Sequence, residues 1–270
     1  MTTTAYYNEI DPYAAQWLRN LIAAGHIAPG DVDERSIEDV HPDDLKHYTQ
    51  CHFFAGIGVW SLALRRAGWP DDRPVWTGSC PCQPFSSAGE GAGLDDPRHL
   101  WPHFAWLIRQ RRPGEVLGEQ VASKDAEPWL DLVQADLEAM EYAFGAIAFP
   151  SAGIGAPHIR DRTYWVANTI MPERSDGQSG IGFVDDPQGR LEGAATSAGL
   201  RSDCSPGPVN GLWADADWLL CRDGKWRPVE PGAFPLAHGA PSRVGRLRAY
   251  GNAINAEAAT QFIAAYMEAA

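Results

Sequence analysis

Apolar and polar residues in the first 167 positions follow two alternating patterns. Short apolar runs predict strands, and stretches with apolar residues three or four positions apart predict helices between them. The predicted strands are residues 5–7, 51–54, 75–77, 116–118, 142–149 and 163–167. The predicted helices are residues 12–23, 60–67, 100–110, 129–140 and, near the end of the chain, 253–267. Strands that alternate with helices in this way favour an open, mainly parallel α/β sheet.

The pattern changes near residue 168. From there to residue 241 Gly, Pro, Ser and Asp predominate, the periodicity fades, and Trp213, Trp218 and Trp226 stand as isolated apolar residues. Such a composition predicts a small, loop-rich lobe with the three tryptophans in its core. We therefore expect a sheet domain made of residues 1–167 and 242–270, and a second lobe made of residues 168–241.

Composition narrows the class of protein. Of the 270 residues 44% are apolar, which is enough for a sizeable core. No run of about 18 apolar residues is present, and the first residues lack the basic and apolar regions of a signal peptide. We therefore expect a cytoplasmic protein that does not enter a membrane. The five cysteines are odd in number and scattered, which argues against a disulfide framework and against a zinc site.

The net charge of −13 argues against indiscriminate binding to nucleic acid. The charge is uneven, however. Residues 1–159 carry 11 Lys and Arg against 22 Asp and Glu, whereas residues 160–250 carry 11 of each, with arginine predominating among the cations. A neutral, arginine-bearing half beside an acidic half is compatible with a localised face that contacts phosphates, and equally with an ordinary solvated surface.

Two segments near the predicted strand ends suggest a ligand site. FAGIG at residues 54–58 follows a strand and opens a helix, where backbone N–H groups and the helix terminus favour an anionic ligand. GSCPCQPFS at residues 78–86 holds thiols on a turn in which Pro81 and Pro84 fix the backbone. Of its two cysteines, we expect Cys80 to be buried and inert, and Cys82 to be the candidate nucleophile.

Three further segments carry polar groups. VLGEQV at residues 116–121 is an apolar strand that ends near the carboxylate of Glu119, a position that a solvated surface residue also occupies commonly. HIRDR at residues 158–162 places Arg160 and Arg162 two apart at a strand entry, so both side chains can converge on one anion or carbonyl. YGNAI at residues 250–254 forms a glycine turn that starts the final helix.

In this order the segments resemble the DNA cytosine-5 methyltransferases, which use S-adenosyl-L-methionine (AdoMet). The resembling blocks are FAGIG, PCQPFS, the RHL that follows at residues 98–100, GEQV in place of ENV, HIRDR in place of QxRxR, and YGNAI. They lie within residues 51–167 and 243–267, roughly half of the chain. The resemblance implies a Rossmann-like AdoMet-dependent methyltransferase sheet with helices on both faces, and a target-recognition lobe at residues 168–241.

The resemblance also implies catalytic roles. Cys82 attacks C6 of cytosine, which makes C5 nucleophilic enough to accept a methyl group. Glu119 protonates or hydrogen-bonds N3, Arg162 holds the base O2, and Arg160 supports the thiol site. Because a stacked base is out of reach of these groups, the target cytosine must be flipped out of the duplex. Three departures from the family pattern, namely His52, Gln120 and His158, leave the reactive groups in place, so we expect activity.

Two cofactor-binding blocks are missing from their usual place, because only 22 residues separate Gly58 from Pro81. Residues 6–14 resemble the ribose-binding block instead, and GDV at residues 30–32 resembles the adenine-binding block. The sequence therefore resembles a circularly permuted methyltransferase whose chain starts at the second strand. The AdoMet-binding residues that the resemblance implies are Glu9, Ile10, Asp31, Val32, Phe54, Gly56, Ile57, Gly58, Pro81 and Asn252.

The permuted reading makes a geometric prediction. The strand near residues 5–8 should lie beside the strand at residues 51–54 and parallel to it, with Glu9 near Gly56 and Gly58. A right-handed connection would also move the helix after Gly58 to the opposite face of the sheet, unless the segment GWPDDRP at residues 68–74 leads the chain back around.

For the function we expect a monomeric methyltransferase that acts on double-stranded DNA. The small lobe suggests a short target of about two to four base pairs. Two alternatives remain open from the sequence: an RNA cytosine-5 methyltransferase that acts on tRNA, and a non-catalytic homologue that only binds nucleic acid. Retention of the Cys, Glu and Arg set favours an enzyme.

Overall fold

A seven-stranded sheet forms the centre of the computed structural model, which describes residues 5–81, 100–123, 126–154, 160–169, 217–220, 226–229 and 253–269. The strand order is β2-β1-β3-β4-β5-β7-β6. The first five strands in this order are parallel, and β7 runs antiparallel to both of its neighbours. The strands are β1 (Ala5–Asn8), β2 (Gly30–Asp33), β3 (Gln50–Phe53), β4 (Val75–Gly78), β5 (Glu115–Val121), β6 (Ala143–Pro150) and β7 (Asp161–Asn168).

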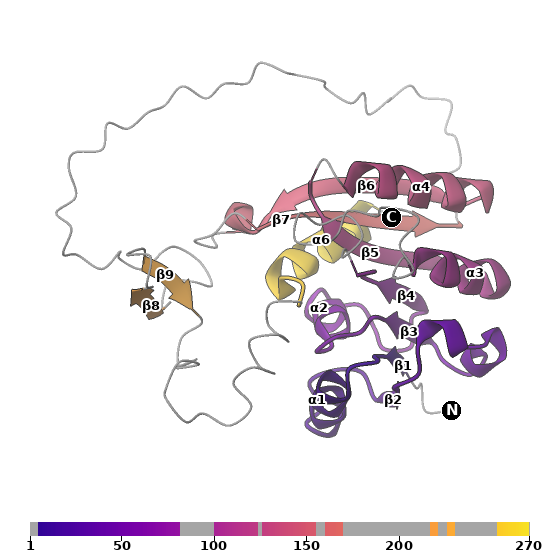
Figure 1. Ribbon diagram of the computed structural model, residues 1–270, viewed down its shortest axis with the longest axis horizontal. Helices are drawn as coiled ribbons and strands as arrows, with labels where there is room; N and C mark the ends of the chain where they lie inside the picture. The colour runs from indigo at the N-terminus through magenta and orange to yellow at the C-terminus, as the bar shows by residue number, and fades with distance from the viewer. Residues whose placement is uncertain are drawn as a thin grey trace, which may run out of the picture.

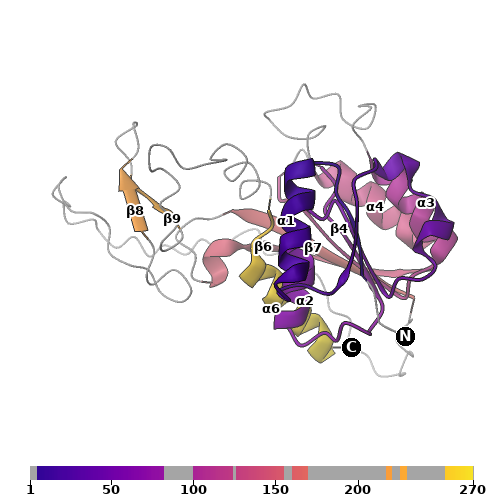
Figure 2. The same ribbon diagram turned by 90° about the horizontal axis from the view of Figure 1, so that it is seen from below.

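Helices cover both faces of this sheet (Figures 1 and 2). The α-helices are α1 (Pro12–Ala23), α2 (Val59–Arg66), α3 (Trp101–Arg111), α4 (Glu127–Ala139) and α6 (Ala256–Ala269), and the short 3₁₀ turns are η1 (Ile37–Asp39), η2 (Pro42–Leu45) and η6 (Ser151–Ile154). One face packs against α1, α2 and α6, and the other packs against η1, η2, α3 and α4. The predicted α/β fold is therefore confirmed.

Capping side chains explain where two of the predicted helices begin. The carboxylate of Asp11 accepts hydrogen bonds from the backbone N–H groups of Tyr13 and Ala14, at 2.9 and 3.3 Å, and Pro12 fixes the first helical residue. The α1 helix thus has the predicted bounds. The side-chain oxygen of Asn255 accepts from the N–H groups of residues 257 and 258, so α6 begins at Ala256 rather than at residue 253.

The strand β2 was not predicted from the apolar pattern. It has only four residues, GDVD, and two of them are carboxylates. At the edge of the sheet it pairs with β1 alone, and an edge strand keeps one side in water where acidic residues are tolerated. Its place therefore depends on pairing with β1 and not on its own hydrophobicity.

The predicted contact between the N-terminal strand and the glycine-turn strand is confirmed. β1 pairs with β3 in parallel, with Ala5 opposite Gln50 and Asn8 opposite Phe53. Ala55 also donates its N–H to the carbonyl of Asn8 at 3.0 Å, which extends the pairing into the turn. The carboxyl ends of the two strands therefore meet at one edge of the sheet.

One helical connection has an unusual hand. From β1 to β2 the chain moves toward the β2 edge of the sheet, and the connecting helix α1 lies on the face that also carries α6. From β4 to β5 the chain moves toward the β6 edge, and the connecting helix α3 lies on the opposite face. Both connections have the same hand, which is right-handed by the strong general preference. From β3 to β4 the chain steps in the direction of β4 to β5, yet α2 lies on the face of α1. The connection through α2 is therefore left-handed.

The segment after α2 explains how the chain returns. Trp69 donates its indole N–H to the carbonyl of Arg73 at 3.1 Å, and Arg65 forms an ion pair with Asp71 at 2.6 Å. Gln50 of β3 donates to the carbonyl of Pro70 at 3.1 Å, which fixes the segment beside the sheet. GWPDDRP thus leads the chain back around, and α2 keeps the face expected for it.

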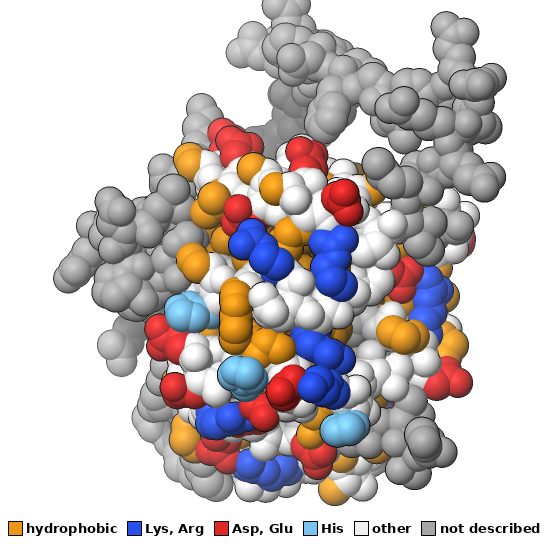
Figure 3. Space-filling view, turned by 90° about the vertical axis from the view of Figure 1, so that its right-hand side faces the viewer, with side chains coloured by type: hydrophobic (Ala, Val, Ile, Leu, Met, Phe, Trp, Pro, Cys, Tyr) orange, Lys and Arg blue, Asp and Glu red, His pale blue; other side chains and the backbone are white. Residues whose placement is uncertain are grey.

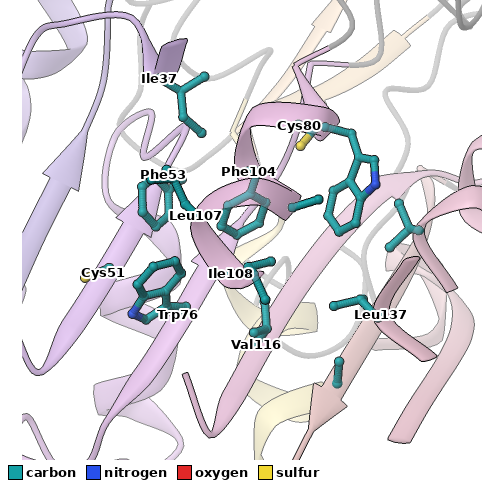
Figure 4. Close-up of a cluster of buried hydrophobic side chains, with 14 of the residues drawn as sticks. Ile37, Cys51, Phe53, Trp76, Cys80, Phe104, Leu107, Ile108, Val116 and Leu137 are labelled. Carbon is teal, nitrogen blue, oxygen red and sulfur yellow. The ribbon is translucent and has the colours of Figure 1, made fainter. Parts of the chain in front are cut away.

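The largest core cluster lies between the sheet and α3 and α4 (Figure 4). Phe104 of α3 packs against Phe53 with ring centroids 4.9 Å apart, and Trp165 of β7 packs edge-on against Trp101 at 6.1 Å. Trp165 fits only because the neighbouring strand has a glycine: a Cβ at Gly118 would lie 2.1 Å from its indole carbons. The glycine before Glu119 therefore lets a tryptophan cover the sheet beside the candidate carboxylate.

The expected second lobe falls mostly outside the described residues. Within residues 168–241 the structure describes β8 (Asp217–Leu220) and β9 (Trp226–Val229), which pair antiparallel as a two-stranded sheet. Trp218 and Trp226 lie in these strands, but their side chains and the whole of Trp213 are outside the described residues. The tryptophan core of the lobe stays a prediction.

Replacement of Gly118 by alanine should strongly destabilise the fold, because Trp165 is fully buried and has no free space to move into. We expect a loss of about 3 kcal/mol or more in the free energy of unfolding, at the upper end of the usual cost of overpacking. Gly145→Ala is the matched control, since its Cβ would meet only Val166 at 4.0 Å. Urea unfolding followed by circular dichroism measures both, and equal stability of the two variants would contradict this packing.

Candidate active site

The carboxyl edge of the parallel strands gathers most of the predicted site residues that the structure describes. Glu9 follows β1, the FAGIG turn follows β3, and Ser79 to Pro81 follow β4. Glu119 lies near the end of β5, and Arg162 lies at the start of the antiparallel strand β7, opposite residue 121. Segments far apart in the sequence therefore meet where sheets of this class bind ligands.

The glycine turn is tight and opens directly into α2. Gly58 donates its N–H to the carbonyl of Ala55 at 2.9 Å and takes φ +78°, a left-handed conformation at the N-cap of the helix. A Cβ at Gly58 would also meet Leu18 at 3.0 Å and Ile27 at 3.1 Å. Phe54 has φ +52°, and its ring packs edge-on against Phe104. The turn is thus held between α1 and α3.

Glu9 holds the turn from the neighbouring strand. Its carboxylate accepts a hydrogen bond from the N–H of Gly56 at 2.7 Å and another from the N–H of Asp11 at 2.8 Å. The predicted approach of Glu9 to the glycine turn is therefore confirmed. Ile10, the next residue, is 64% exposed, which is unusual for a large apolar side chain. A carboxylate, an exposed apolar surface and backbone amides thus lie side by side.

Asp31 and Val32 lie within β2 and not at its end. Asp31 is exposed and accepts a hydrogen bond from the hydroxyl of Tyr48 at 2.9 Å, and Val32 packs against the cluster beneath α1. Asp33 is nearer to Glu9, whose N–H donates to the Asp33 carbonyl at 3.0 Å. Whether Asp31 and Val32 contact a cofactor stays a prediction, and Asp33 is a neighbour of Glu9 that the motif comparison did not single out.

Glu119 is the buried carboxylate of the site. Its side chain is 9% exposed, and Oε1 forms an ion pair of 2.6 Å with Nε of Arg162. Burial raises the pKa of Glu119 above its usual value, and the positive charges of Arg162 and Arg160 oppose that rise. A carboxyl with a raised pKa is suited to give a proton near neutral pH.

Arg160 and Arg162 differ in how they meet Glu119, so the predicted convergence of the two side chains on one group stays a prediction. Arg162 contacts the carboxylate directly, whereas the guanidinium of Arg160 donates to the backbone carbonyl of Ala253. Arg160 therefore joins the start of β7 to the segment before α6. Asn252, the next residue upstream, lies outside the described residues, as do His158 and Ile159.

The thiol turn is described only up to Pro81. Cys80 is 5% exposed and lies in the core cluster shown in Figure 4, and burial raises the pKa of its thiol. The expectation that Cys80 is buried is confirmed, and its thiol is unsuited to act as a nucleophile. Cys82 lies outside the described residues, so its role stays a prediction.

The structure shows the contacts of Gln120 and His52, two of the residues that depart from the family pattern. Gln120 accepts a hydrogen bond from the N–H of Val121 at 3.0 Å and lies 3.5 Å from the carbonyl of Cys80, so it bridges β5 and the thiol turn. His52 is buried in β3, where Nδ1 lies 2.8 Å from the hydroxyl of Thr77. Burial lowers the pKa of His52 to about 3, so the ring is neutral.

Two residues of the site were missed by sequence reasoning. Trp60, in the first turn of α2, donates its indole N–H to the hydroxyl of Ser79 at 3.0 Å. The hydroxyl of Ser79 in turn hydrogen-bonds the carboxylate of Glu119. Neither residue belongs to a reactive type at a motif position, so only their meeting in space identifies them.

The face over α3 carries both signs of charge, with lysines and arginines interspersed among acidic residues and histidines (Figure 3). Lys46, for example, pairs with Asp43, and Arg35 pairs with Asp44. The described residues on this face therefore carry mixed charges rather than one sign of charge. Among the described residues, no cluster of His, Cys, Asp and Glu could hold a metal ion, and none of the helices could cross a membrane.

Comparison with known proteins agrees with the motifs. Residues 68–174 match the family model for the C-5 cytosine-specific DNA methylase. Over these residues the chain is similar to that family. It is similar to the Type II methyltransferase M.HhaI of Haemophilus parahaemolyticus, with 30% identity over 99 residues, and to M1.ScrFI of Lactococcus lactis subsp. cremoris, with 32% identity over 99 residues.

These two matches cover only part of this chain and only part of each relative. They span 35% of this chain in both cases, and 30% and 25% of the two relatives, so the chain matches less than a third of their length. Among solved structures, the S. pombe Dnmt2 methyltransferase is similar at 15% identity and a TM-score of 0.39, over 63% of this chain and 52% of that one.

Arg162→Met should destabilise the fold much more at pH 8 than at pH 5. Without the guanidinium, burial keeps the pKa of Glu119 well above that of an unfolded glutamate, so folding stability is present at low pH and lost as the pH rises. At pH 8 we expect a loss of up to about 3–5 kcal/mol, the cost of breaking a buried pair. Urea unfolding at the two pH values measures it.

Arg19→Met provides the control for that experiment. Arg19 pairs with Glu34 at the same 2.6 Å, but the two side chains are 41% and 39% exposed. An exposed pair contributes less than about 1 kcal/mol, so this variant should lose little stability at either pH. A pH-independent loss in Arg162→Met would show that Glu119 is not held by the guanidinium.

Proposed function

We propose that this protein is a DNA cytosine-5 methyltransferase. The observation that carries the proposal is the buried carboxylate of Glu119, held by Arg162 beside the turn that leads to Cys82. A carboxyl of raised pKa beside a cysteine turn suits acid catalysis combined with nucleophilic attack. The match of residues 68–174 to the family model of the C-5 cytosine-specific DNA methylase supports DNA as the substrate.

The edge of the sheet fits AdoMet. The carboxylate of Glu9 can accept hydrogen bonds from ribose hydroxyls in addition to the two backbone amides that it already binds. Ile10 offers an exposed apolar surface for a flat base, and the position of a Cβ at Gly56 is open space. When bound, AdoMet supplies a methyl group on a positively charged sulfur. Glu9, Ile10 and the turn at residues 54–58 would hold it.

The residues of the chain then act on the flipped cytosine in a defined order. The Cys82 thiolate adds to C6, and the electron pair of the C5–C6 double bond moves into the ring as Glu119 gives its proton to N3. Arg162 holds the base O2, and Arg160 supports the thiol turn. C5 would then accept the methyl group from bound AdoMet, whose S–CH3 bond would break with the electron pair left on sulfur. N3 would return its proton to Glu119, and loss of the C5 proton to solvent with departure of the Cys82 thiolate would restore the double bond and leave 5-methylcytosine.

We further propose that the chain is circularly permuted. In doubly wound nucleotide-binding sheets the strand before the glycine turn comes first, and the order is 3-2-1-4-5. Here the same positions are β2-β1-β3-β4-β5, with the glycine turn after β3. Suppose that β1, α1 and β2 followed α2 in the chain. The present β3, β1 and β2 would then be the first, second and third strands, so the order across the sheet would read 3-2-1. The helix α2 would then lead from β3 to β1, and this connection would be right-handed. One relocation thus accounts for both irregularities.

The competing candidate within the same chemistry is an RNA methyltransferase. Its target would be a single-stranded or loop cytosine in tRNA, which needs no duplex opening. The family model that residues 68–174 match is that of a DNA methylase, which favours DNA for this chain. Bisulfite sequencing of plasmid DNA and of total tRNA from one expressing culture separates them. Converted plasmid cytosines together with protected tRNA cytosines would overturn the DNA assignment.

Cys82→Ala should abolish methylation of DNA and leave AdoMet binding within about twofold of wild type. Cys80→Ala is the matched control, because that thiol is buried in the core. It should retain activity, with the loss of stability that removal of a small buried group brings. Transfer of a radiolabelled methyl group to plasmid DNA measures both. Substantial turnover by Cys82→Ala would remove the proposed nucleophile.

Glu9→Gln should weaken AdoMet binding at least tenfold, because an amide replaces a charged acceptor and one of its two acceptor sites becomes a donor facing the N–H groups of Gly56 and Asp11. Glu34→Gln serves as the control on the same edge, since Glu34 is exposed and pairs only with Arg19 across the surface. Calorimetric titration with AdoMet measures both. Equal affinity of the two variants would contradict a cofactor site at Glu9.

A further inference from the structure

Ser79 links three elements of the edge. It follows β4 directly, so it lies one position beyond Gly78, which is paired with Gly118 of β5. Its hydroxyl oxygen accepts the indole N–H of Trp60 at 3.0 Å. Trp60 belongs to the first turn of α2, immediately after the glycine turn. A single serine therefore connects the glycine turn, the thiol turn and the strand that carries Glu119.

The bond from Trp60 determines what the hydroxyl of Ser79 can donate to. An indole N–H is a donor only, so the serine oxygen acts as the acceptor in this pair. The serine proton is then directed away from Trp60 and toward the carboxylate of Glu119, which lies beside Ser79 because the preceding residues, Gly78 and Gly118, are paired. A hydroxyl that accepts one hydrogen bond also donates a stronger one. The arrangement is thus a directed chain from the indole through the serine to the carboxylate.

Trp60 is itself held rigidly. It is 4% exposed, and its ring packs edge-on against Tyr164 with centroids 6.2 Å apart. Tyr164 lies directly opposite Glu119 in the β5–β7 pairing. Among the described residues, the charged and titratable groups that face Glu119 are Arg162, Arg160 and Tyr164, all from β7. Ser79 follows β4, the other neighbour of β5, and therefore approaches the carboxylate from the opposite side.

We propose that Ser79 is a positioning residue for Glu119: fixed by the Trp60 indole and placed beside Glu119 by the pairing of β4 with β5, its hydroxyl orients the carboxylate. This inference rests on the proposed function, because it concerns the carboxyl that acts on the base. Arg162 contacts the carboxylate from β7, and Ser79 lies on the β4 side of it.

The direction of the effect follows from the hydrogen bond. A donor to the carboxylate stabilises the charged form, so removal of the hydroxyl raises the pKa of Glu119 further. Activity that needs the protonated carboxyl is lost as the pH rises through that pKa. In Ser79→Ala the alkaline limb of kcat should therefore move upward, by about one pH unit for a hydrogen bond to a charged group.

Three variants test the proposal. Ser79→Ala removes the hydroxyl, Ser79→Thr retains it, and Trp60→Phe keeps an aromatic side chain, though a smaller one, but removes the indole N–H. We expect the full upward shift of the alkaline limb in Ser79→Ala, the wild-type limb in Ser79→Thr, and a smaller shift in the same direction in Trp60→Phe. Infrared titration of the free enzymes, with Glu119→Gln subtracted, follows the carboxyl directly and needs neither DNA nor AdoMet.

The outcomes separate this inference from the proposed function. An infrared shift in Ser79→Ala that Ser79→Thr reverses supports the positioning role, even in a protein without methyltransferase activity. A carboxyl titration that is the same in Ser79→Ala and wild type would overturn it, whatever happens to kcat. A fall in kcat with an unchanged alkaline limb would also overturn it, because that result marks a structural serine.

Discussion

The parallel pairing of β1 with β3 is the contact on which the rest of the site depends. It brings Glu9 to the turn at Gly56, across 47 residues of sequence, and it joins the pair of β1 and the edge strand β2 to the rest of the sheet. Without this pairing the glycine turn would lack its carboxylate. The carboxyl edge therefore has two parts. Glu9 and the glycine turn lie at the ends of β1 and β3, and Glu119 and Arg162 lie on β5 and β7.

The two parts are joined through α2. Its first turn carries Trp60, whose indole reaches Ser79 next to the thiol turn. The position of α2 in turn depends on the left-handed connection and on the ion pair of Arg65 with Asp71, which closes the segment behind it. A connection of the rarer hand is tolerated here because α2 packs against α6 in one core cluster and against α1 in another. The helix thus keeps its place although the strand that follows it lies on the other side of β3.

Much of this arrangement could be predicted from the sequence, and the limits have physical causes. The apolar pattern located α1 and most strands, and the motifs located Glu119 and Arg162 because a reactive chemistry requires those groups. β2 was missed since its stability comes from pairing with β1. Ser79 and Trp60 were missed because their meeting depends on the fold of α2 over the sheet. Neither a periodicity nor a motif encodes such a contact.

The most direct test of the account is covalent trapping of the cysteine by DNA that contains 5-fluorocytosine. After addition of the thiolate and methyl transfer, the fluorine at C5 cannot leave as a proton does, so the adduct should persist. Peptide mapping by mass spectrometry then identifies the modified residue. We predict an AdoMet-dependent adduct on Cys82. Absence of any adduct, or an adduct on another cysteine, would contradict the account.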